Sequence, residues 1–232
     1  PGQYVDGPFE LFPECLKEYS DIANRRFHAE PVACGRCGPQ LLFSQAGHEI
    51  TDNEAALAAC VTALREGLVV AVKGVGGYHL MCDAADPATV QRLRAHKRRP
   101  HKPLALMFPL SDGLAELTRV VTLSAEETAL LRTPGRPIVL ATQKTGNGRP
   151  QGIAPGLGEV GVMLPYSPLH HLLLNDFGGP LVATSANISG EPVLTERTSV
   201  EKSLAAVAEA FLHHDRPIVR PADDSVYRSL SG

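Results

Sequence analysis

The chain has 232 residues but no tryptophan, and aromatic residues make up only 5% of it. So few aromatic rings leave few platforms on which nucleic-acid bases could stack. No uninterrupted apolar stretch is long enough to cross a bilayer, and residues 1–10 lack the basic-then-apolar order of a signal peptide. We therefore expect a cytoplasmic protein with no membrane partner, and nucleic acid is not an expected ligand.

Common catalytic signatures are also absent from the sequence. It contains no G-x-S-x-G motif, and Cys60 and Cys82 have no histidine at a diagnostic spacing. The glycine-rich turn at residues 73–77 fits neither a P-loop nor a dinucleotide motif, so it is either a phosphate cradle of another kind or a close-packed structural turn. This inventory permits a reaction that depends on positioning and on electrostatic stabilisation of phosphoryl oxygens.

A change of pattern near residue 46 divides the chain in two. Residues 1–45 have few periodic apolar positions, whereas residues 46–232 alternate amphipathic helices with short apolar strands. We expect a zinc-finger-like segment at 1–45 and an α/β domain at 46–232. The expected helices lie at 54–65, 87–96, from 124, from 168, and from 198 to just before 215; the expected strands lie at 68–72, 104–106, 138–141, 181–184 and 218–220, the last extending toward 226–227.

The C-x-x-C pair of Cys34 and Cys37 predicts a metal knuckle, because two thiolates on a tight turn can bind one tetrahedral ion. Cys15 lies upstream at a suitable loop length, but Phe12 stands where a fourth cysteine would be expected. The fourth ligand is then either His28 or a water, in a structural Zn²⁺ site that is incomplete. The alternative is a degenerate knuckle that no longer holds metal.

Two distant segments carry groups that suit a nucleotide polyphosphate. Lys97-Arg98-Arg99 follows an expected helix, and Thr184-Ser185-Ala186-Asn187 follows an expected strand. Cations neutralise phosphate charge, while hydroxyl and amide groups fix its orientation. The alternative is that the cations are the solvated end of a helix, where positive charge is favourable.

Other polar residues are further candidates. Lys73, Tyr78 and His79 offer a cation, a phenol and an imidazole to a small polar substrate, and Asp223-Asp224-Ser225 either holds Mg²⁺ or caps a turn. Adjacent residues on a helix point about 100° apart and cannot both face one ion. We therefore assign the histidine pairs at 170–171 and 213–214 to helix surface and core.

Three segments closely resemble the carbamoyltransferase HypF family of NiFe-hydrogenase maturation. They are residues 24–39 (NRRFHAEPVACGRCGP), 72–84 (VKGVGGYHLMCDA) and 184–192 (TSANISGEP). The resemblance covers nearly the whole chain. It implies the end of the family's second zinc finger, followed by a YrdC-like domain whose fold is a twisted, mixed sheet with helices around it.

The resemblance also implies roles for particular residues. The family's K-x-R…S-x-N signature falls on Lys97, Arg99, Ser185 and Asn187, which would grip the nucleotide's phosphates, and a further phosphate-binding serine falls on Ser225. The family's zinc cysteines match Cys15, Cys34 and Cys37. Phe12 departs from that pattern.

The implied activity is formation of carbamoyl-adenylate from ATP, with Mg²⁺, and a carbamoyl group that comes from carbamoyl phosphate. In the family a further domain passes the carbamoyl group to the partner HypE, on the way to the cyanide ligand of the hydrogenase. That domain is not in this sequence, so full transfer activity is not expected.

Two other functions remain open. A threonylcarbamoyl-adenylate synthase for tRNA modification shares the K-x-R…S-x-N site, but its Thr-Asp-Thr turn is replaced here by Gly74, Val75 and Gly76. The missing hydroxyls weaken the case for threonine as a substrate. A non-catalytic RNA-binding module would use the basic turn and the knuckle, and the scarcity of aromatic residues counts against it.

Overall fold

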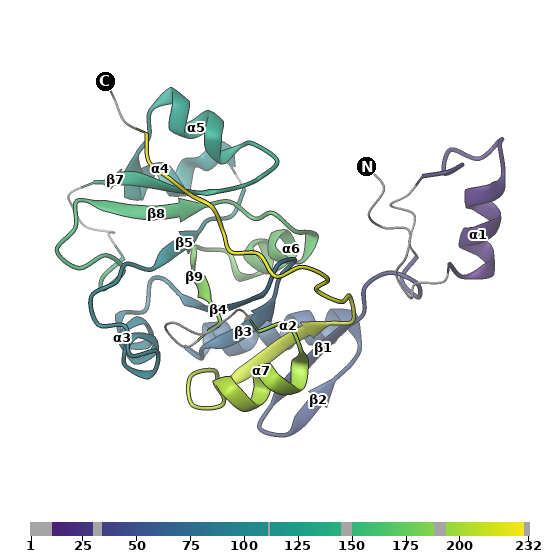
Figure 1. Cartoon of the computed structure of the whole chain (residues 1–232), viewed down its shortest axis with the longest axis horizontal. Coiled ribbons are helices and arrows are strands. Elements are labelled where there is room, and N and C mark those ends of the chain that lie inside the picture. The colour runs from purple at the N-terminus through teal and green to yellow at the C-terminus, as the bar shows by residue number, and fades with distance from the viewer. Residues whose placement is uncertain (1–10, 30–33, 111, 145–149, 188–193, 230–232) are drawn as a thin grey trace.

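The computed structural model describes residues 11–29, 34–110, 112–144, 150–187 and 194–229. Its centre is one sheet of eleven strands in the order β11-β7-β8-β5-β9-β4-β3-β10-β1-β2, with β6 paired to β7 (Figure 1). The strands are Leu41–Gln45 (β1), His48–Ile50 (β2), Val70–Lys73 (β3), Tyr78–Asp83 (β4), Ala105–Met107 (β5), Val121–Thr122 (β6), Ile138–Gln143 (β7), Glu159–Met163 (β8), Leu181–Ser185 (β9), Ala210–His214 (β10) and Val226–Tyr227 (β11).

The sheet is mixed. The pairs β3/β10, β5/β8 and β7/β11 are parallel, and the other ladders are antiparallel. The helices are Pro13–Ser20 (α1), Asn53–Arg65 (α2), Pro87–His96 (α3), Ala115–Val120 (α4), Ala125–Leu131 (α5), Pro168–Phe177 (α6) and Arg197–Leu204 (α7), with a 3₁₀ turn at Asp112–Leu114. The expected fold class, a YrdC-like mixed sheet with surrounding helices after a small cysteine-bearing segment, is confirmed.

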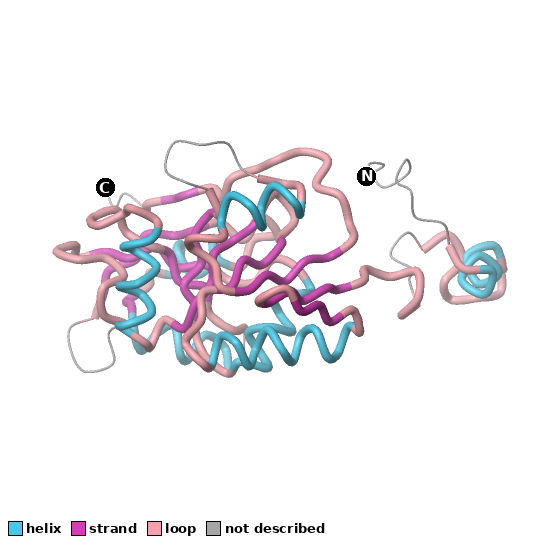
Figure 2. Tube along the Cα trace, turned by 90° about the horizontal axis from the view of Figure 1, so that it is seen from below, coloured by secondary structure: helices cyan, strands magenta, loops and turns pink. Residues whose placement is uncertain are grey.

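Helices cover both faces of the sheet (Figure 2). Apolar side chains of α2 and α6 pack on one face against β1, β3, β9 and β10, whereas α3, α4, α5 and α7 pack on the other. Strand β4 serves both faces, because Leu80 and Cys82 point to one cluster and Met81 to the other, as the alternation of a strand requires. Cys60 and Cys82 are core residues with no exposed surface.

Capping groups fix several helix starts where the sequence indicates them. Asp52, Asp86 and Ser167 each accept a backbone N–H of the following helix, and Pro87 and Pro168 occupy the first helical position. Ser124 forms a reciprocal capping box with Glu127 at the start of α5.

The C-terminal third differs from expectation. Helix α7 ends at Leu204, its N-cap is Glu196 with no side-chain cap, and the stretch expected to continue the helix forms strand β10 instead. A short apolar run does not by itself distinguish helix from buried strand. Here β10 lies between β1 and β3, and hydrogen bonding along both of its edges favours the strand over the helix. Residues 218–220 form no strand, whereas Val226–Tyr227 does.

The sheet begins earlier in the chain than expected. Strand β1 lies within residues 1–45, yet all five of its residues pair with β10. The cysteine-bearing segment with α1 lies to one side of the sheet (Figure 1). Among the described helices, none is both long and apolar enough to cross a membrane.

Two adjacent leucines of α6 test the packing of this layer. Leu173 is fully buried, and Leu172 is 53% exposed. We expect Leu173→Ala to lower the free energy of unfolding by about 2–5 kcal/mol, since it opens a cavity under the sheet. Leu172→Ala, its matched control, should change it by no more than about 0.5 kcal/mol. Denaturant unfolding measures both, and equal losses would contradict the packing described.

Candidate functional site

Lys97 and Arg99 turn inward at the end of α3. Lys97 is the C-cap residue and Arg98 has φ of 51°, so the chain reverses and Arg98 stays exposed. Lys97 is only 4% exposed. Its Nζ donates to the hydroxyl of Thr184 at 3.1 Å and to the carbonyl of Ser185. This burial excludes a solvated helix end for Lys97.

Arg99 shares the same acceptor. Its Nη1 donates to Thr184 Oγ1 at 3.1 Å, and its Nη2 donates to the carbonyl of Pro103 at 2.9 Å. A threonine hydroxyl has two acceptor lone pairs, enough for both cations. Thr184 therefore holds two like charges side by side. The only signal for this role in the sequence is the position of Thr184 directly before the expected Ser-x-Asn pair.

Arg94 shapes the basic turn from within, and sequence reasoning missed it. It is 8% exposed and donates hydrogen bonds to five backbone carbonyls. Three belong to the turn itself, and two belong to a loop before β8; they are the carbonyls of Arg99, Pro100, Lys102, Gly152 and Ile153. A guanidinium offers its five N–H donors in a rigid fork, which suits this arrangement. The only sequence signal is a cation in the last turn of a helix.

Burial changes the acidity of Lys97. Desolvation lowers its pKa to about 7, and the nearby positive charges of Arg99 and Lys102 act in the same direction. The pKa of Arg99 is lowered as well, first by burial and then by Arg94. The charged form of Lys97 is thus poorly stabilised by the protein alone, and an anion placed there would relieve this cost.

Ser185 and Asn187 lie at the same place. The Ser185 hydroxyl donates to Asn187 Oδ1 at 2.8 Å, and the backbone N–H of Ala186 donates to the carbonyl of Tyr78 at 2.7 Å. The structure therefore gathers Lys97, Arg99, Ser185 and Asn187 around the end of β9. Segments 87 residues apart meet there, and the predicted role in phosphate binding stays a prediction.

The three substrate candidates do not lie together. Lys73 and Tyr78 are opposite each other in the β3/β4 ladder and share a face, while His79 points to the other face. Lys73 Nζ donates to the carbonyl of His214 at 3.0 Å. The hydroxyl of Tyr78 lies 2.8 Å from His213 Nδ1, and His213 Nε2 lies 3.1 Å from Glu201.

The glycines of the 73–77 turn are explained by close packing. A Cβ on Gly74 would lie 3.0 Å from the hydroxyl of Tyr166, and one on Gly76 would lie 2.6 Å from the carbonyl oxygen of Ala222. The Gly74 N–H donates to the carbonyl of Gly77 at 2.7 Å. Close packing thus accounts for Gly74 and Gly76, while Val75 between them is 64% exposed.

The histidine pairs prove different from each other. His170 on α6 is fully buried as a core residue, with its pKa lowered to about 3 by burial first and by neighbouring histidines second. His213 and His214 lie on strand β10, so their expected place on a helix is wrong. Burial lowers the pKa of His213 to about 4 despite Glu201 beside it.

Asp224 and Ser225 belong to the segment after β10. Asp224 Oδ2 lies 2.9 Å from His79 Nε2, and the carbonyl of Ser225 accepts from the N–H of Ile138 at 2.8 Å. Neither aspartate joins a group of three or more potential metal ligands within the described part of the chain. A Mg²⁺ site built from Asp223 and Asp224 alone is therefore not supported.

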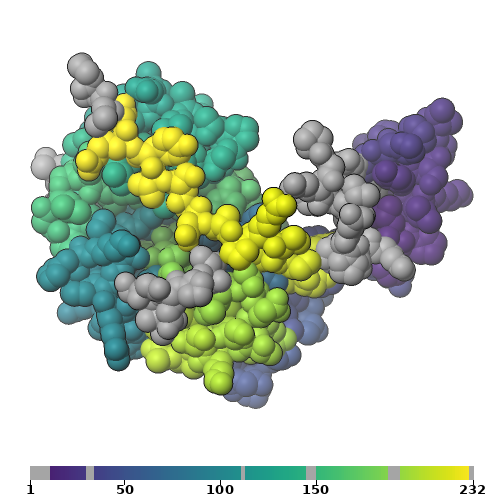
Figure 3. All heavy atoms as spheres, viewed as in Figure 1, coloured from purple at the N-terminus to yellow at the C-terminus, as the bar shows by residue number. Residues whose placement is uncertain are grey.

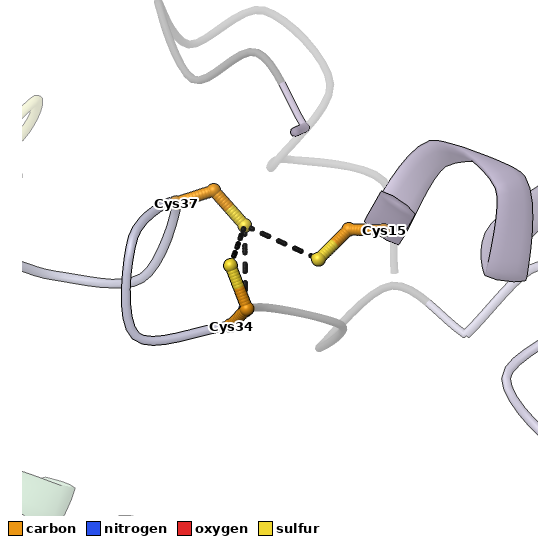
Figure 4. A group of neighbouring side chains, drawn as sticks. All are labelled: Cys15, Cys34 and Cys37. Carbon is orange, nitrogen blue, oxygen red and sulfur yellow. Dashed lines mark hydrogen bonds between the residues drawn. The ribbon is translucent and has the colours of Figure 1, made fainter. Parts of the chain in front are cut away.

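Among the described residues, one group could hold a metal ion: the thiols of Cys15, Cys34 and Cys37, whose sulfurs all lie within 4.8 Å of one another (Figure 4). Backbone N–H groups of Cys37 and Arg36 lower the pKa of Cys34 to about 7, and burial raises that of Cys15 to about 11. A sulfur triangle of this size fits a single Zn²⁺, which favours thiolate ligands.

Among the described residues, no further side chain joins the three sulfurs as a fourth ligand. The ring of His28 stacks on Tyr19 and Phe27, with centroids at 5.0 and 4.2 Å, and His28 is not part of the sulfur group. Phe12 carries the guanidinium of Arg36 over its ring at 4.3 Å. A cation–aromatic contact thus stands where a fourth thiolate was expected.

Comparison with known proteins identifies the class to which this fold and site belong. The model of the Sua5/YciO/YrdC family, described as telomere recombination, matches residues 62–232. The chain belongs to this family. A threonylcarbamoyl-AMP synthase from Alkalilimnicola ehrlichii is 33% identical over 150 residues, covering 64% of this chain and 77% of that protein.

The cysteine-bearing segment shows which proteins of this family the chain resembles most in domain content. The HypF finger model matches residues 13–43. The carbamoyltransferase HypF of Rhodobacter capsulatus is 49% identical over 221 residues, covering 95% of this chain but 29% of that protein. A crystal structure of full-length HypF in a phosphate- and nucleotide-bound form has a TM-score of 0.85 at 40% identity, covering 95% and 28% of the two chains. The chain is HypF-like and spans under a third of these relatives.

The altered finger yields a prediction. Cys15, Cys34 and Cys37 should share one structural zinc, and Phe12→Cys should tighten its binding by about tenfold or more and raise the thermal midpoint, since metal binding and folding are coupled. Competition with a chromophoric chelator measures the affinity. Glu14→Cys is the matched control, because it adds an exposed thiol one residue from Cys15 that points about 100° away. No zinc in the parent, even when supplied, would indicate a degenerate knuckle.

Proposed function

We propose that this chain binds ATP with Mg²⁺ and forms carbamoyl-adenylate, as part of carbamoyl transfer in NiFe-hydrogenase maturation. The observation that carries the proposal is the convergence of two cations, the buried Lys97 and the half-buried Arg99, on Thr184 beside Ser185 and Asn187. Buried positive charge is costly unless it is paired, so a site of this kind is suited to a polyanion.

The chemistry requires little of the protein besides positioning and charge. A carbamate oxygen attacks the α-phosphorus of ATP, the bond from that phosphorus to the bridging oxygen breaks, and pyrophosphate leaves. Lys97 and Arg99 would stabilise the charge on the phosphate oxygens, while the hydroxyl of Ser185 and the amide of Asn187 would orient them. Ser225 would add a further contact from the C-terminal segment. Mg²⁺ would enter with the nucleotide.

Lys73 would meet the carbamoyl group, which would be derived from carbamoyl phosphate. It lies on the same face of the sheet as Tyr78, is 8% exposed, and has its pKa lowered by burial. The hydroxyl of Tyr78 is committed to His213. The three cysteines would hold Zn²⁺ in a purely structural role, and the acceptor of the carbamoyl group would be a protein such as HypE.

The competing reaction is threonylcarbamoyl-adenylate formation, which the relative from Alkalilimnicola ehrlichii favours. The two proposals differ in their co-substrates. Pyrophosphate release that depends on threonine and bicarbonate would establish threonylcarbamoyl-adenylate formation. Pyrophosphate release that depends on carbamate and needs no threonine would support carbamoyl-adenylate formation.

Removing either cation tests the site. We expect Lys97→Met and Arg99→Met to weaken Mg·ATP binding by about ten- to a hundredfold, since a charge-assisted hydrogen bond contributes about 1.5–3 kcal/mol. The fold should survive, because replacing a buried charge by an apolar chain is often neutral. Calorimetry measures the affinity, with exposed Arg98→Ala as the matched control. No heat with the parent at millimolar nucleotide would defeat the assignment.

The lowered pKa of Lys97 predicts a pH dependence. Below pH 7 the ammonium is charged with or without nucleotide, so the affinity for ATP should be flat there. Above pH 7 the empty site holds neutral lysine, and a bound phosphate raises its pKa, so binding takes up a proton. The affinity should therefore fall by up to about tenfold per pH unit as the pH rises.

Calorimetry in two buffers of different ionisation enthalpy measures this proton uptake. Lys97→Met should bind with no such uptake, which separates Lys97 from any titration of the nucleotide itself. The same uptake in both proteins would show that Lys97 is charged in the empty site.

A further inference from the structure

The segment after β10, coloured yellow, runs across the face of the molecule that Figure 3 shows. The N–H of Ala222 donates to the carbonyl of Gly76 at 3.0 Å. The backbones approach so closely that a Cβ on Gly76 would lie 2.6 Å from the Ala222 oxygen. The segment is thus attached to the loop between β3 and β4 by a contact that only glycine permits.

Two residues further on, the segment is attached to the sheet itself. Asp224 Oδ2 lies 2.9 Å from His79 Nε2, and the two side chains are 25% and 6% exposed. A carboxylate can only accept, so Nε2 carries the hydrogen. When the ring is neutral, Nδ1 is then the acceptor and faces the hydroxyl of Tyr166 at 3.5 Å. His79 is held from both sides.

His79 is also a direct neighbour of the phosphate-site strand. It lies opposite Ser185 in the β4/β9 ladder, and opposed residues share a face with Cβ atoms about 4.5–5.5 Å apart. Ser225, which follows Asp224, is anchored in turn by Ile138 on β7. One histidine therefore connects the C-terminal segment to the strand that carries Ser185.

We propose that Asp224 and His79 are positioning residues that hold the C-terminal segment against the nucleotide site and so present Ser225 to the phosphates. This inference rests on the proposed function. It gives His79 a role different from substrate contact. It also explains why a buried histidine on β4 faces an acidic side chain from residues far along the chain.

Adjacent aspartates provide the test. Asp224→Ala should weaken Mg·ATP binding by about three- to tenfold, as expected for the loss of one hydrogen bond that orients a ligand group. Asp223 is exposed, and Asp223→Ala should leave the affinity unchanged. Asp224→Asn keeps an acceptor for Nε2–H and should restore most of the affinity. Thermal midpoints of all variants show whether each is folded.

Ser225→Ala distinguishes positioning from simple stabilisation. It should weaken binding in the parent but add nothing in the Asp224→Ala background, since Ser225 is already misplaced there. Full additivity of the two changes, or equal affinity of Asp224→Ala and the parent, would overturn the inference while leaving the proposed function intact. A parent that does not bind Mg·ATP removes the proposed function and, with it, this inference.

Discussion

The burial of positive charge at the end of α3 is the constraint on which the rest of the site depends. Lys97 and Arg99 cannot be withdrawn from water without acceptors, and the available acceptors are Thr184 and the carbonyls of Ser185 and Pro103. Those contacts fix how α3 meets β9. Arg94 fixes the turn between them by binding five carbonyls, so the electrostatics of the site and the course of the backbone are determined together.

The sheet separates two polar groups that the sequence places side by side. Lys73, Tyr78 and His213 lie on the face covered by α3 and α7, whereas His79 and Tyr166 lie toward α6. The alternation of side chains along β4 makes this separation unavoidable for Tyr78 and His79. Both groups flank the turn from β3 to β4, and the C-terminal segment contacts that turn through the N–H of Ala222, which donates to the carbonyl of Gly76.

The cysteine-bearing segment depends on a different interaction. Its three sulfurs converge, and no other described side chain joins them as a ligand; the Arg36 guanidinium packs over the Phe12 ring. Its attachment to the domain runs through polar contacts, since Arg216 donates to the carbonyl of Cys37 at 2.6 Å and Asp215 accepts from the N–H of Gln40 at 3.0 Å. Metal in this segment would therefore affect local stability more than the nucleotide site.

The sequence alone determined what local signals encode. The starts of the helices expected near residues 54, 87, 124 and 168 could be predicted, and caps at Asp52, Asp86, Ser124 and Ser167 account for them. The C-x-x-C spacing predicted the thiol pair, and a basic turn with a Ser-x-Asn pair indicated one site. Strand pairing and side-chain contacts between distant segments were decided only by the tertiary structure. Strand β10 formed because β1 and β3 pair with both its edges, Thr184 and Arg94 gained their roles from acceptors and donors far along the chain, and Asp224 found His79 across 145 residues. Local sequence specifies backbone conformation and capping, but burial and cross-strand pairing are set by contacts between segments that no short pattern describes.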